Sequence, residues 1–456
     1  MTLEELKKSK ASKKLYGLIG FPLGHSVSPG IHMRYFESNG VDAGYILAEI
    51  PPDKLEAAVP VLREKLAGFN CTIPHKERIV PFLDALDDSA RYGAVNTVKN
   101  EGGKLIGYNT DGEGFLAALE RAKIETGRKR VLLLGAGGVA RTIAYLLAER
   151  GARIDIFSLE YAETLARDIK LEIENARIAV TGSQDMTGFY DLLVNATPSG
   201  MYPKVNAMPV GDETIKNCGA VYDAVYNPIR TKLVLRAQKH GARAEGGLAM
   251  LVFQAAAAQR IWTGCMPPLE LTEEIIRQME KMIPREFPIC IVLFGFMGSG
   301  KTAVGKILAG KLEMDFHDLD AEIEKNTGMT IPEIFERYGE EAFRRMEHEL
   351  LSSFVYQKST VLAVGGGALA SKENIKALEN TPCTAVFLQA SMENMLRRVD
   401  GGKGRPMLSG EDMEKRARAL YEKRLPSYLA AADVIVNADA APEETAEKII
   451  HILALT

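Results

Sequence analysis

The stretch CIVLFGFMGSGKT, residues 290–302, decides the fold of the C-terminal part of the chain. A β-branched apolar run leads directly into the pattern GxxxxGK[ST], which ends in Lys301 and Thr302 and is followed by residues of helical character. Gly298 and Gly300 let backbone N–H groups close on phosphate oxygens, and the next helix offers its positive N-terminal end to the same anion. The sequence therefore predicts a strand, a phosphate-binding loop and a helix of a parallel α/β domain.

Acidic residues follow the next predicted strand, in FHDLD, residues 316–320. Lys301 is expected to reach the β and γ phosphates of a bound nucleotide, and Thr302 to give its hydroxyl to Mg²⁺. On an extended backbone Asp318 and Asp320 would point to the same side of the sheet, so one could serve the metal through water while the other holds an acceptor hydroxyl. A solvated acidic turn is the alternative interpretation of this motif alone.

Further segments carry arginines or glycines suited to anions. EEAFRRMEHE, residues 340–349, places Arg344 on a predicted helix, and a glycine triplet at 365–367 closes a β-branched strand where backbone can approach a ligand closely. Arg424 offers a second guanidinium fork for a carboxylate. RRVDGGKGRP, residues 397–406, is expected to be a short loop that closes as a lid and adds positive charge to a transferring phosphoryl group.

With these motifs in this order, residues 289–456 resemble shikimate kinase across nearly their whole length. The resemblance implies ATP-dependent phosphorylation of the 3-hydroxyl of shikimate. It also implies that Asp320 holds the ring hydroxyls and acts as, or orients, the base, and that Asp318 serves Mg²⁺ through its water shell. The other implied contacts are Arg344, Arg424 and the backbone of Gly366 and Gly367 with the carboxylate, Arg405 with the phosphates, and Arg398 with adenine.

A second glycine-rich turn, GAGGVA, residues 135–140, follows the predicted strand 131–134 and opens a helix. It fits GxGxxG/A in the strand, turn and helix context that predicts a Rossmann dinucleotide-binding lobe. The positions that form this turn are Gly135, Gly137, Gly138 and Ala140. Glu160 comes just after the next predicted strand, 154–157, where a carboxylate typically binds the adenine-ribose hydroxyls of NAD.

Polar side chains recur in the segments before this turn. They lie in GFPLGHSVSPGIH (20–32), GFNCTIPHK (68–76), GAVNT (93–97) and GYNTDGEGF (107–115). They are Ser26, Ser28, Asn70, Thr72, Lys76, Asn96 and Asp111. Each alone also fits helix capping, turn chemistry or a solvated charge. Together they predict a polar pocket that faces the dinucleotide lobe, with Lys76 and Asp111 as the groups that handle a proton.

Residues 15–264 resemble shikimate dehydrogenase. The resemblance implies reversible reduction of 3-dehydroshikimate to shikimate by hydride from NADP or NAD in its reduced form. It implies that Lys76 donates the proton to the developing alkoxide and that Asp111 orients it. The other implied contacts are Ser26 and Ser28 with the carboxylate, Asn70, Thr72, Asn96, Asp111 and Gln254 with ring hydroxyls, Tyr226 near the substrate and Gly247 near the nicotinamide.

The segment Phe-Ser-Leu-Glu at 157–160 departs from that family, in which most members have Asn-Arg-Thr to bind the 2′-phosphate of NADP. An arginine there would attract the phosphate dianion, whereas Glu160 would repel it. No arginine or lysine occurs between Arg153 and Arg167. We therefore predict a weakened preference for NADP and use of NAD.

Length and composition fit a globular chain of several domains. At about 150 residues per domain, 456 residues make about three domains, and 46% hydrophobic with 25% charged residues excludes a disordered or fibrous chain. The alternation of strands and helices predicts an α/β fold throughout. Strands are expected at 15–20, 131–134, 154–157, 192–195, 220–224, 290–295, 361–364 and 384–388. The expected parts are a tail at 1–14, a shikimate-binding lobe at 15–110 and 244–285, a Rossmann lobe at 111–243 and a P-loop kinase domain at 286–456, which follows a linker at 283–288.

Charge and cysteine usage exclude several classes of protein. A net charge of −4 leaves no basic excess for nucleic acid or anionic lipid. The five cysteines include no CxxC pair and the seven histidines no HExxH, so we expect neither a disulfide framework nor a metal bound by protein side chains alone. The weakly polar stretch 246–258 is too short to span a bilayer and the charged start lacks an apolar core, so a reducing cytoplasm is the expected location.

The combined interpretation is a bifunctional enzyme for two consecutive steps toward shikimate 3-phosphate. One alternative is a dehydrogenase that prefers quinate, joined to a kinase for a related small acid. The other is a ligand-sensing regulator built from degenerate copies of these modules. The sequence retains the residues that the chemistry needs, which weighs against the regulator: Lys76, Asp111, Lys301, Thr302, Asp320 and Arg405. The sequence leaves the oligomeric state open.

Overall fold

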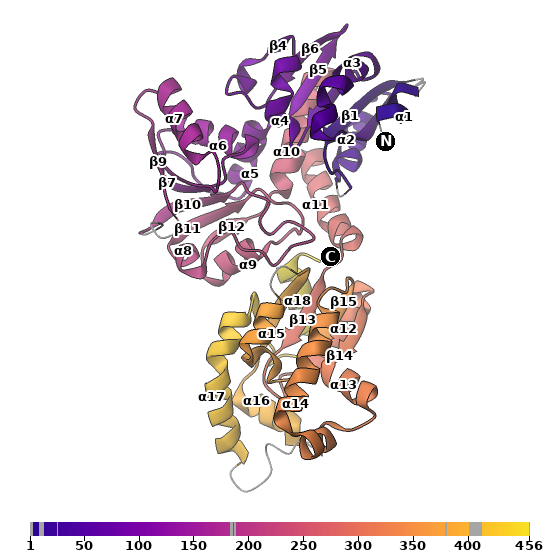
Figure 1. Cartoon of the computed structure of the whole chain (residues 1–456), viewed down its shortest axis with the longest axis vertical. Helices are drawn as coiled ribbons and strands as arrows, with labels where there is room; N and C mark the ends of the chain where they lie inside the picture. Colours follow the sequence, from indigo (N-terminus) through magenta and orange to yellow (C-terminus); the bar gives the residue numbers. More distant parts are fainter. Residues whose placement is uncertain are drawn as a thin grey trace. The chain divides into compact units, whose positions relative to one another are not determined.

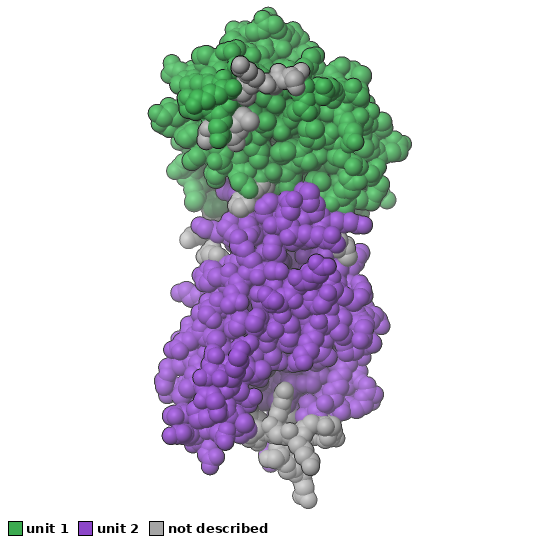
Figure 2. Space-filling model, turned by 90° about the vertical axis from the view of Figure 1, so that its right-hand side faces the viewer, with its two compact units in different colours: residues 1–197, 210–226, 242–279 green, residues 198–209, 227–241, 280–456 purple. Residues whose placement is uncertain are grey.

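The computed structural model describes residues 3–8, 13–24, 26–182, 186, 188–378, 381–400 and 413–455 (Figure 1). These residues form three β-sheets with helices, which confirms the predicted α/β class. Contacts divide the chain into two compact units, coloured separately in Figure 2. Unit 1 comprises Met1–Thr197, Val210–Tyr226 and Ala242–Met279, and unit 2 comprises Pro198–Pro209, Asn227–Gly241 and Glu280–Thr456.

The first sheet of unit 1 is mixed and has the strand order β2-β1-β3-β5-β6-β4. Its strands are β1 (Lys14–Gly20), β2 (Ala43–Glu49), β3 (Gly68–Cys71), β4 (Ala85–Leu86), β5 (Thr97–Glu101) and β6 (Lys104–Tyr108). β1 pairs in parallel with β2 and β3, and β5 pairs antiparallel with β3 and β6. Gly102 and Gly103, both at positive φ, form the two-residue turn between β5 and β6.

Several helices accompany this sheet, and one of them, α10, packs against it although it comes much later in the sequence. The helices are α1 (Leu3–Lys8), α2 (Ser28–Ser38), α3 (Leu55–Lys65), α4 (His75–Arg78), α5 (Asp111–Arg121) and α10 (Leu248–Thr263), with 3-10 turns at Pro52–Lys54, Val80–Phe82 and Asp88–Ala90. Trp262 of α10 packs at a tilt against Tyr16, with ring centroids 4.9 Å apart, and donates a hydrogen bond from Nε1 to the carbonyl of Val98 at 3.0 Å. A Cβ on Gly68 would lie 2.6 Å from that Nε1 atom, so the strand needs glycine there.

The second sheet of unit 1 is parallel and has the order β12-β11-β10-β7-β8-β9. Its strands are β7 (Arg130–Leu134), β8 (Arg153–Phe157), β9 (Arg177–Val180), β10 (Tyr190–Asn195), β11 (Cys218–Asp223) and β12 (Arg243–Glu245), and the helices between them in sequence are α6 (Gly138–Glu149), α7 (Ala162–Glu172), α8 (Asp212–Lys216) and α9 (Lys232–Lys239). Of these, α9 belongs to unit 2. Because β7 lies between β8 and β10, its carboxyl end is the topological switch point where such sheets bind ligands.

Unit 2 contains a parallel five-stranded sheet in the order β14-β15-β13-β16-β17. Its strands are β13 (Cys290–Phe294), β14 (Asp315–Asp318), β15 (Thr360–Ala363), β16 (Cys383–Gln389) and β17 (Val434–Asn437). Its helices are α12 (Lys301–Leu312), α13 (Leu319–Thr327), α14 (Ile331–Phe354), α15 (Lys372–Ala377), α16 (Met392–Asp400), α17 (Met413–Ala431) and α18 (Pro442–Leu453), with a 3-10 turn at Ala368–Ala370. The central strand β13 is almost fully buried, as expected for a parallel strand covered on both faces.

Every predicted strand is present, but three local predictions differ from the structure. Asp320 lies in the first turn of α13 rather than on extended backbone, because β14 ends at Asp318 and a carboxylate is favourable at a helix N-terminus. Arg398 lies in α16 rather than in a loop, since MENMLRRVD is rich in helix formers. Part of the predicted linker at 283–288 is helical, because α11 (Leu269–Glu286) continues through Pro284.

Among the residues that the structure describes, no helix combines the length and the apolar character needed to cross a membrane.

Candidate active sites

Lys76 and Asp111 form a nearly buried ion pair in unit 1. Lys76 lies on the short helix α4, and Asp111 is the first residue of α5. The Nζ atom of Lys76 donates to Oδ2 of Asp111 at 2.5 Å, and the two side chains are 12% and 6% exposed. With so little solvent around it, the attraction is weakly screened and the pair is held in one geometry. Such a pair can deliver a proton to a substrate oxygen or remove one from it.

Amide side chains extend this pair into a hydrogen-bonded network. Nδ2 of Asn96 donates to Oδ1 of Asp111 at 2.9 Å and to Oε1 of Gln254 at 3.1 Å. The buried Asn70 donates from Nδ2 to the carbonyl of Asn96 at 3.1 Å. Networks of this kind fix the positions of their members because an unpaired buried polar group is costly. The structure thus brings together Asn70, Asn96, Asp111 and Gln254 with Lys76.

The remaining predicted substrate residues lie on other segments of unit 1. Oγ of Ser26 donates to Oγ of Ser28 at 3.2 Å, at the start of α2. Thr72 directly follows β3. Burial raises the pKa of Tyr226 from 10 to about 12, so its hydroxyl stays protonated well into the alkaline range. The contacts of these four residues with a substrate stay predictions.

The glycine-rich turn between β7 and α6 lies against the stem of Lys76. Gly135 has a φ of +107°, a conformation that favours glycine, and Gly137 is the N-cap residue of α6. A Cβ on Gly138 would lie 3.2 Å from Cβ of Lys76, and Ala140 is fully buried in the helix. The N-terminus of α6, which suits a pyrophosphate, is therefore adjacent to the Lys76 network.

Gly247 and Glu160, the two other predicted cofactor residues of unit 1, differ in their surroundings: one is packed against backbone and the other is exposed. A Cβ on Gly247 would lie 2.2 Å from the carbonyl oxygen of Ala224, so glycine is required there by backbone packing. Glu160 is exposed in the turn after β8, where Oγ of Ser158 donates to the Glu160 carbonyl at 2.8 Å. That turn carries a carboxylate and no cation, as the sequence already indicates.

The phosphate-binding loop of unit 2 has the predicted conformation. Gly298 has a φ of +76°, and a Cβ there would lie 2.2 Å from the carbonyl oxygen of Met395. Gly300, at a φ of +91°, is the N-cap residue of α12. Nζ of Lys301 donates to the carbonyls of Gly295 at 3.1 Å and of the next residue at 3.0 Å. The lysine thus folds over the loop whose N–H groups would receive the phosphates.

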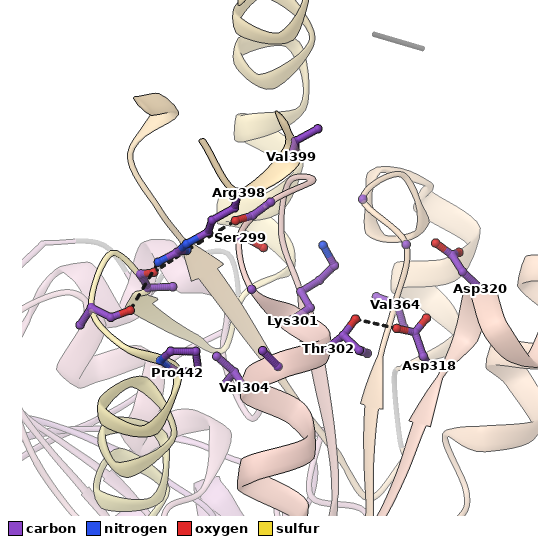
Figure 3. A pocket seen from close by; sticks show the side chains of 18 residues that line it. Ser299, Lys301, Thr302, Val304, Asp318, Asp320, Val364, Arg398, Val399 and Pro442 are labelled. Carbon is purple, nitrogen blue, oxygen red and sulfur yellow. Dashed lines mark hydrogen bonds between the residues drawn. The ribbon is translucent and has the colours of Figure 1, made fainter. Parts of the chain in front are cut away.

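Oxygen donors suited to Mg²⁺ lie beside this loop. Oγ1 of Thr302 donates to Oδ2 of Asp318 at 2.7 Å, and both line a cavity of about 510 Å³ together with Lys301 and Asp320 (Figure 3). A hydroxyl and a carboxylate are hard ligands that leave room for phosphate oxygens and water on the metal. Among the described residues, no cluster of three or more histidine, cysteine or acidic side chains could hold a metal.

Arg344 and Arg424 converge on the glycine triplet; their role as a carboxylate clamp stays a prediction. Nη1 of Arg424 donates to the carbonyl of Gly366 at 3.0 Å. A Cβ on Gly367 would lie 2.7 Å from Nη2 of Arg344, so the guanidinium group lies directly against this backbone. A Cβ on Gly366 would lie 3.4 Å from the carbonyl of Gly295 in the phosphate-binding loop. The two arginines are therefore adjacent to the nucleotide cleft.

Glu347 also belongs to this site, although the sequence analysis did not assign it. It is fully buried, and its Oε2 accepts a hydrogen bond from Arg344 at 2.8 Å. A Cβ on Gly365 would lie 2.9 Å from Oδ1 of Asp320 and 3.1 Å from Oε1 of Glu347. Burial raises the pKa of Glu347, with Arg344 opposing that effect. The sequence does indicate an ion pair here, because Glu347 follows Arg344 by three residues on a predicted helix.

Arg398 is held at the rim of the same cavity. Its Nη1 atom donates to the carbonyl of Ala438 at 2.9 Å and its Nη2 atom to that of Asp439 at 3.2 Å (Figure 3). The guanidinium plane is thus fixed beside the phosphate-binding loop, where a nucleotide base could stack on it. Arg405, the predicted lid arginine, lies outside the described residues.

Comparison with known proteins identifies both parts of the chain. Residues 18–98 match the family described as shikimate dehydrogenase substrate binding domain, residues 247–277 the shikimate 5′-dehydrogenase C-terminal domain, and residues 297–454 shikimate kinase. Shikimate dehydrogenase (NADP(+)) of Geobacillus kaustophilus is 41% identical over 270 residues, which cover 58% of this chain and 98% of the relative. The corresponding enzyme of Moorella thermoacetica is 38% identical over 279 residues, 59% of this chain and 94% of the relative.

Solved structures agree with these matches. Shikimate 5-dehydrogenase of Thermus thermophilus in complex with NADP(H) and shikimate is 33% identical, with a TM-score of 0.53, over 58% of this chain and 99% of that one. The Listeria monocytogenes enzyme in complex with shikimate and NAD is 30% identical, with a TM-score of 0.53, over 59% and 98%. A 5-ketofructose reductase of Gluconobacter is 33% identical, with a TM-score of 0.51, over 59% and 100%. The chain therefore belongs to the shikimate dehydrogenase family in its N-terminal part and continues into a shikimate kinase domain at residues 297–454, so that it is a fusion of the two.

Proposed function

We propose that this chain reduces 3-dehydroshikimate to shikimate with NADPH or NADH and then phosphorylates shikimate at its 3-hydroxyl with ATP and Mg²⁺. The observation that carries the first activity is the buried pair of Lys76 and Asp111 beside the glycine-rich turn. The second activity is supported by Arg344 and Arg424, which converge on a backbone adjacent to the phosphate-binding loop.

In the dehydrogenase reaction, Lys76 acts at the substrate oxygen. A nicotinamide bound at the glycine-rich turn would supply hydride to the carbonyl carbon, so that negative charge would grow on the carbonyl oxygen. The ammonium of Lys76 stabilises that charge and gives the oxygen its proton. Asp111 and Asn96 keep Lys76 in place, because Asp111 accepts from both of them. Ser26 and Ser28 would bind the substrate carboxylate.

In the kinase reaction, positioning and electrostatics do most of the work. Arg344 and Arg424 would hold the carboxylate of shikimate, which orients its ring toward the phosphate-binding loop. Asp320 would then hold the reacting hydroxyl and accept or direct its proton. Thr302 and Asp318 would hold Mg²⁺, and Lys301 would contact the β and γ phosphates. Arg405 would add positive charge to the transferring group.

Two other substrates for the first site are part of the test. Quinate carries the same carboxylate and three ring hydroxyls, with one further hydroxyl and no ring double bond. The similar 5-ketofructose reductase acts, by its name, on a ketone without a carboxylate. The hydroxyl pair of Ser26 and Ser28, together with the second acid-binding site in the same chain, favours shikimate.

All five cysteines are free thiols, which supports the predicted reducing cytoplasm.

Product analysis by mass tests the proposal. The purified chain is incubated with 3-dehydroshikimate, each reduced nicotinamide in turn, ATP and Mg²⁺. Shikimate is expected without ATP and shikimate 3-phosphate with it. Parallel reactions with 3-dehydroquinate, the keto acid whose reduction gives quinate, and with 5-ketofructose measure the alternatives under the same reducing conditions. A higher catalytic efficiency with either of these, or no phosphorylated product from shikimate, would reject the assignment.

A further inference from the structure

Helix α9 is part of unit 2, although it lies between β11 and β12 of unit 1 in the sequence. Leu235 of α9 belongs to the same hydrophobic core as the strands β13 and β16. Thr231 caps the helix by accepting from the backbone N–H of Val234. The shikimate kinase match begins only at residue 297, so α9 is an addition to the kinase domain rather than part of the matched segment.

The cations of α9 meet a buried carboxylate that precedes β17. Asp433 is 1% exposed, and its Oδ2 atom accepts from the backbone N–H of Ala385 at 2.8 Å. Its Oδ1 atom lies 3.2 Å from Nζ of Lys232 and 3.3 Å from Nη2 of Arg236. Nearly all of the Arg236 side chain is buried as well. A buried carboxylate is strongly destabilising when its cationic partner is removed, so these contacts fix α9 firmly.

The same helix also satisfies the C-terminal carbonyls of α17. Nη2 of Arg236 donates to the carbonyl of Ala430 at 3.1 Å. Nζ of Lys239 donates to the carbonyls of Leu429 at 2.8 Å and of Ala432 at 3.2 Å. The last carbonyls of a helix have no donor within the helix, and cations are favourable there. The end of α17 is thus capped by side chains from α9.

The C-terminal half of α17 carries Arg424, one of the two arginines of the carboxylate clamp. Arg424 donates to the carbonyl of Gly366 at 3.0 Å, and the hydroxyl of Tyr428 donates to the same carbonyl. Tyr428 immediately precedes Leu429, whose carbonyl Lys239 binds. A shift of the last turn of α17 would therefore move Tyr428 and Arg424 relative to the glycine triplet.

We propose that α9 braces the acceptor subsite of the kinase, with Arg236 and Lys239 as positioning residues that hold Arg424 where the carboxylate of the phosphoryl acceptor binds. The nucleotide subsite at Lys301 and Thr302 does not depend on this brace, because β13 and α12 form it. The proposal rests on the kinase activity proposed above, and it assigns to residues 227–241 a role in the kinase reaction.

Steady-state kinetics of the full-length chain with the Arg236→Ala substitution tests this brace. The KM for shikimate is expected to rise about tenfold, which corresponds to ~1.4 kcal/mol, while the KM for ATP stays within about twofold. Arg236→Lys keeps a cation and should restore much of the affinity. Arg418→Ala is the matched control, since Arg418 lies on α17, the helix that α9 contacts, in an exposed pair with Glu414.

Amide hydrogen exchange of the same proteins measures how firmly the end of α17 is held, and it does not depend on enzymatic activity. Amides from 424 to 433 should exchange about tenfold faster in Arg236→Ala than in the wild type or in Arg418→Ala. Lys239→Met removes only a partly exposed cation and provides a second variant if Arg236→Ala does not fold. Unchanged exchange and unchanged KM for shikimate in the folded variant, or an equal rise of both KM values, would overturn the proposal. A wild type that exchanges as expected but does not phosphorylate shikimate would instead reject the proposed kinase function.

Discussion

The Nζ atom of Lys76 lies 2.5 Å from the Oδ2 atom of Asp111, although the two residues are 35 positions apart in the chain. One comes from the helix after β3 and the other from the first turn of the helix that leads toward the Rossmann lobe. A single short contact thus links the substrate-binding lobe to the start of the dinucleotide-binding part. A Cβ on Gly138 would lie 3.2 Å from Cβ of Lys76, so the proposed proton donor is adjacent to the glycine-rich turn.

Replacing Lys76 with Met is expected to lower kcat of the dehydrogenase by about 100-fold to 10,000-fold, the usual contribution of a positioned acid or base. The KM for shikimate should change much less, because the lysine acts mainly on charge that develops in the transition state. Initial rates of NADP or NAD reduction with shikimate measure both constants. Kinase activity of the same sample reports that the chain is folded.

Lys216→Met is the matched control, since Lys216 lies in unit 1 in an exposed pair with Glu213. It should leave both activities unchanged. Equal losses of kcat in the two variants, or a Lys76→Met enzyme with nearly normal kcat, would remove Lys76 from the chemistry.

Local sequence patterns predicted the parts of the sites that depend on backbone shape. Both glycine-rich turns were recognised because each needs a conformation or a close approach that only glycine permits, as at Gly135 and Gly298. The strands that precede them are continuous apolar runs, which parallel sheets covered on both faces require. Such features are encoded within a few neighbouring residues.

What the sequence could not supply depends on contacts between distant segments. Glu347 is identified by its burial beside Asp320 and Arg344, and the brace of α9 by Asp433, which lies almost two hundred positions away. The sequence predicted an extended backbone at Asp320, but this residue lies in a helix. Over only three residues, the pattern of a strand cannot be distinguished from that of a helix start. Helix boundaries of this kind are decided by tertiary packing more than by local preference.

His32 should make unit 1 less stable in mild acid. Burial lowers its pKa from 6.5 to about 3, and its ring stacks on Tyr45 and contacts Gln259. Because the folded state binds the proton less readily than the unfolded state, this contribution to the unfolding free energy is present above pH 6.5 and is lost as the pH falls below it. At one unit below that value the loss amounts to about 1.4 kcal/mol.

Denaturant unfolding followed by the fluorescence of Trp262, the single tryptophan, measures this loss because the indole lies near His32. His32→Phe keeps a ring but cannot titrate, so its unfolding free energy should fall less between pH 7.5 and about pH 5.5. His451→Gln, an exposed histidine of unit 2, should behave like the wild type. If His32→Phe and the wild type have the same pH dependence, His32 does not carry it.

Asp318→Asn should raise the Mg²⁺ concentration that the kinase needs. The asparagine can still accept from Thr302, but it lacks the charge that attracts the metal and its water shell. The half-saturating concentration of Mg²⁺ at fixed ATP is expected to rise about tenfold, with a smaller change of kcat at saturating metal. Asp315→Asn, an exposed carboxylate at the start of the same strand, is the control. Identical Mg²⁺ dependence of the two variants would exclude Asp318 from the metal site.

Glu160 should decide how the dehydrogenase distinguishes its two nicotinamides. It follows β8 at the position where a carboxylate can bind the ribose hydroxyls. The arginine of α6, Arg141, donates to Asp168 at 3.1 Å. The 2′-phosphate of NADP would therefore face the carboxylate of Glu160, and the turn itself contains no lysine or arginine to bind it. We therefore expect NAD to be used with an efficiency comparable to that of NADP.

Glu160→Arg should shift the ratio of kcat/KM for NADP over NAD by at least about tenfold toward NADP, because the new guanidinium attracts the phosphate dianion. Glu163→Arg, on the exposed side of the first turn of α7, makes the same change of net charge and should shift the ratio much less. Direct titration of both cofactors without substrate separates binding from catalysis. A wild type that strongly prefers NADP, or equal shifts in the two variants, would mean that the 2′-phosphate is recognised by groups other than this turn.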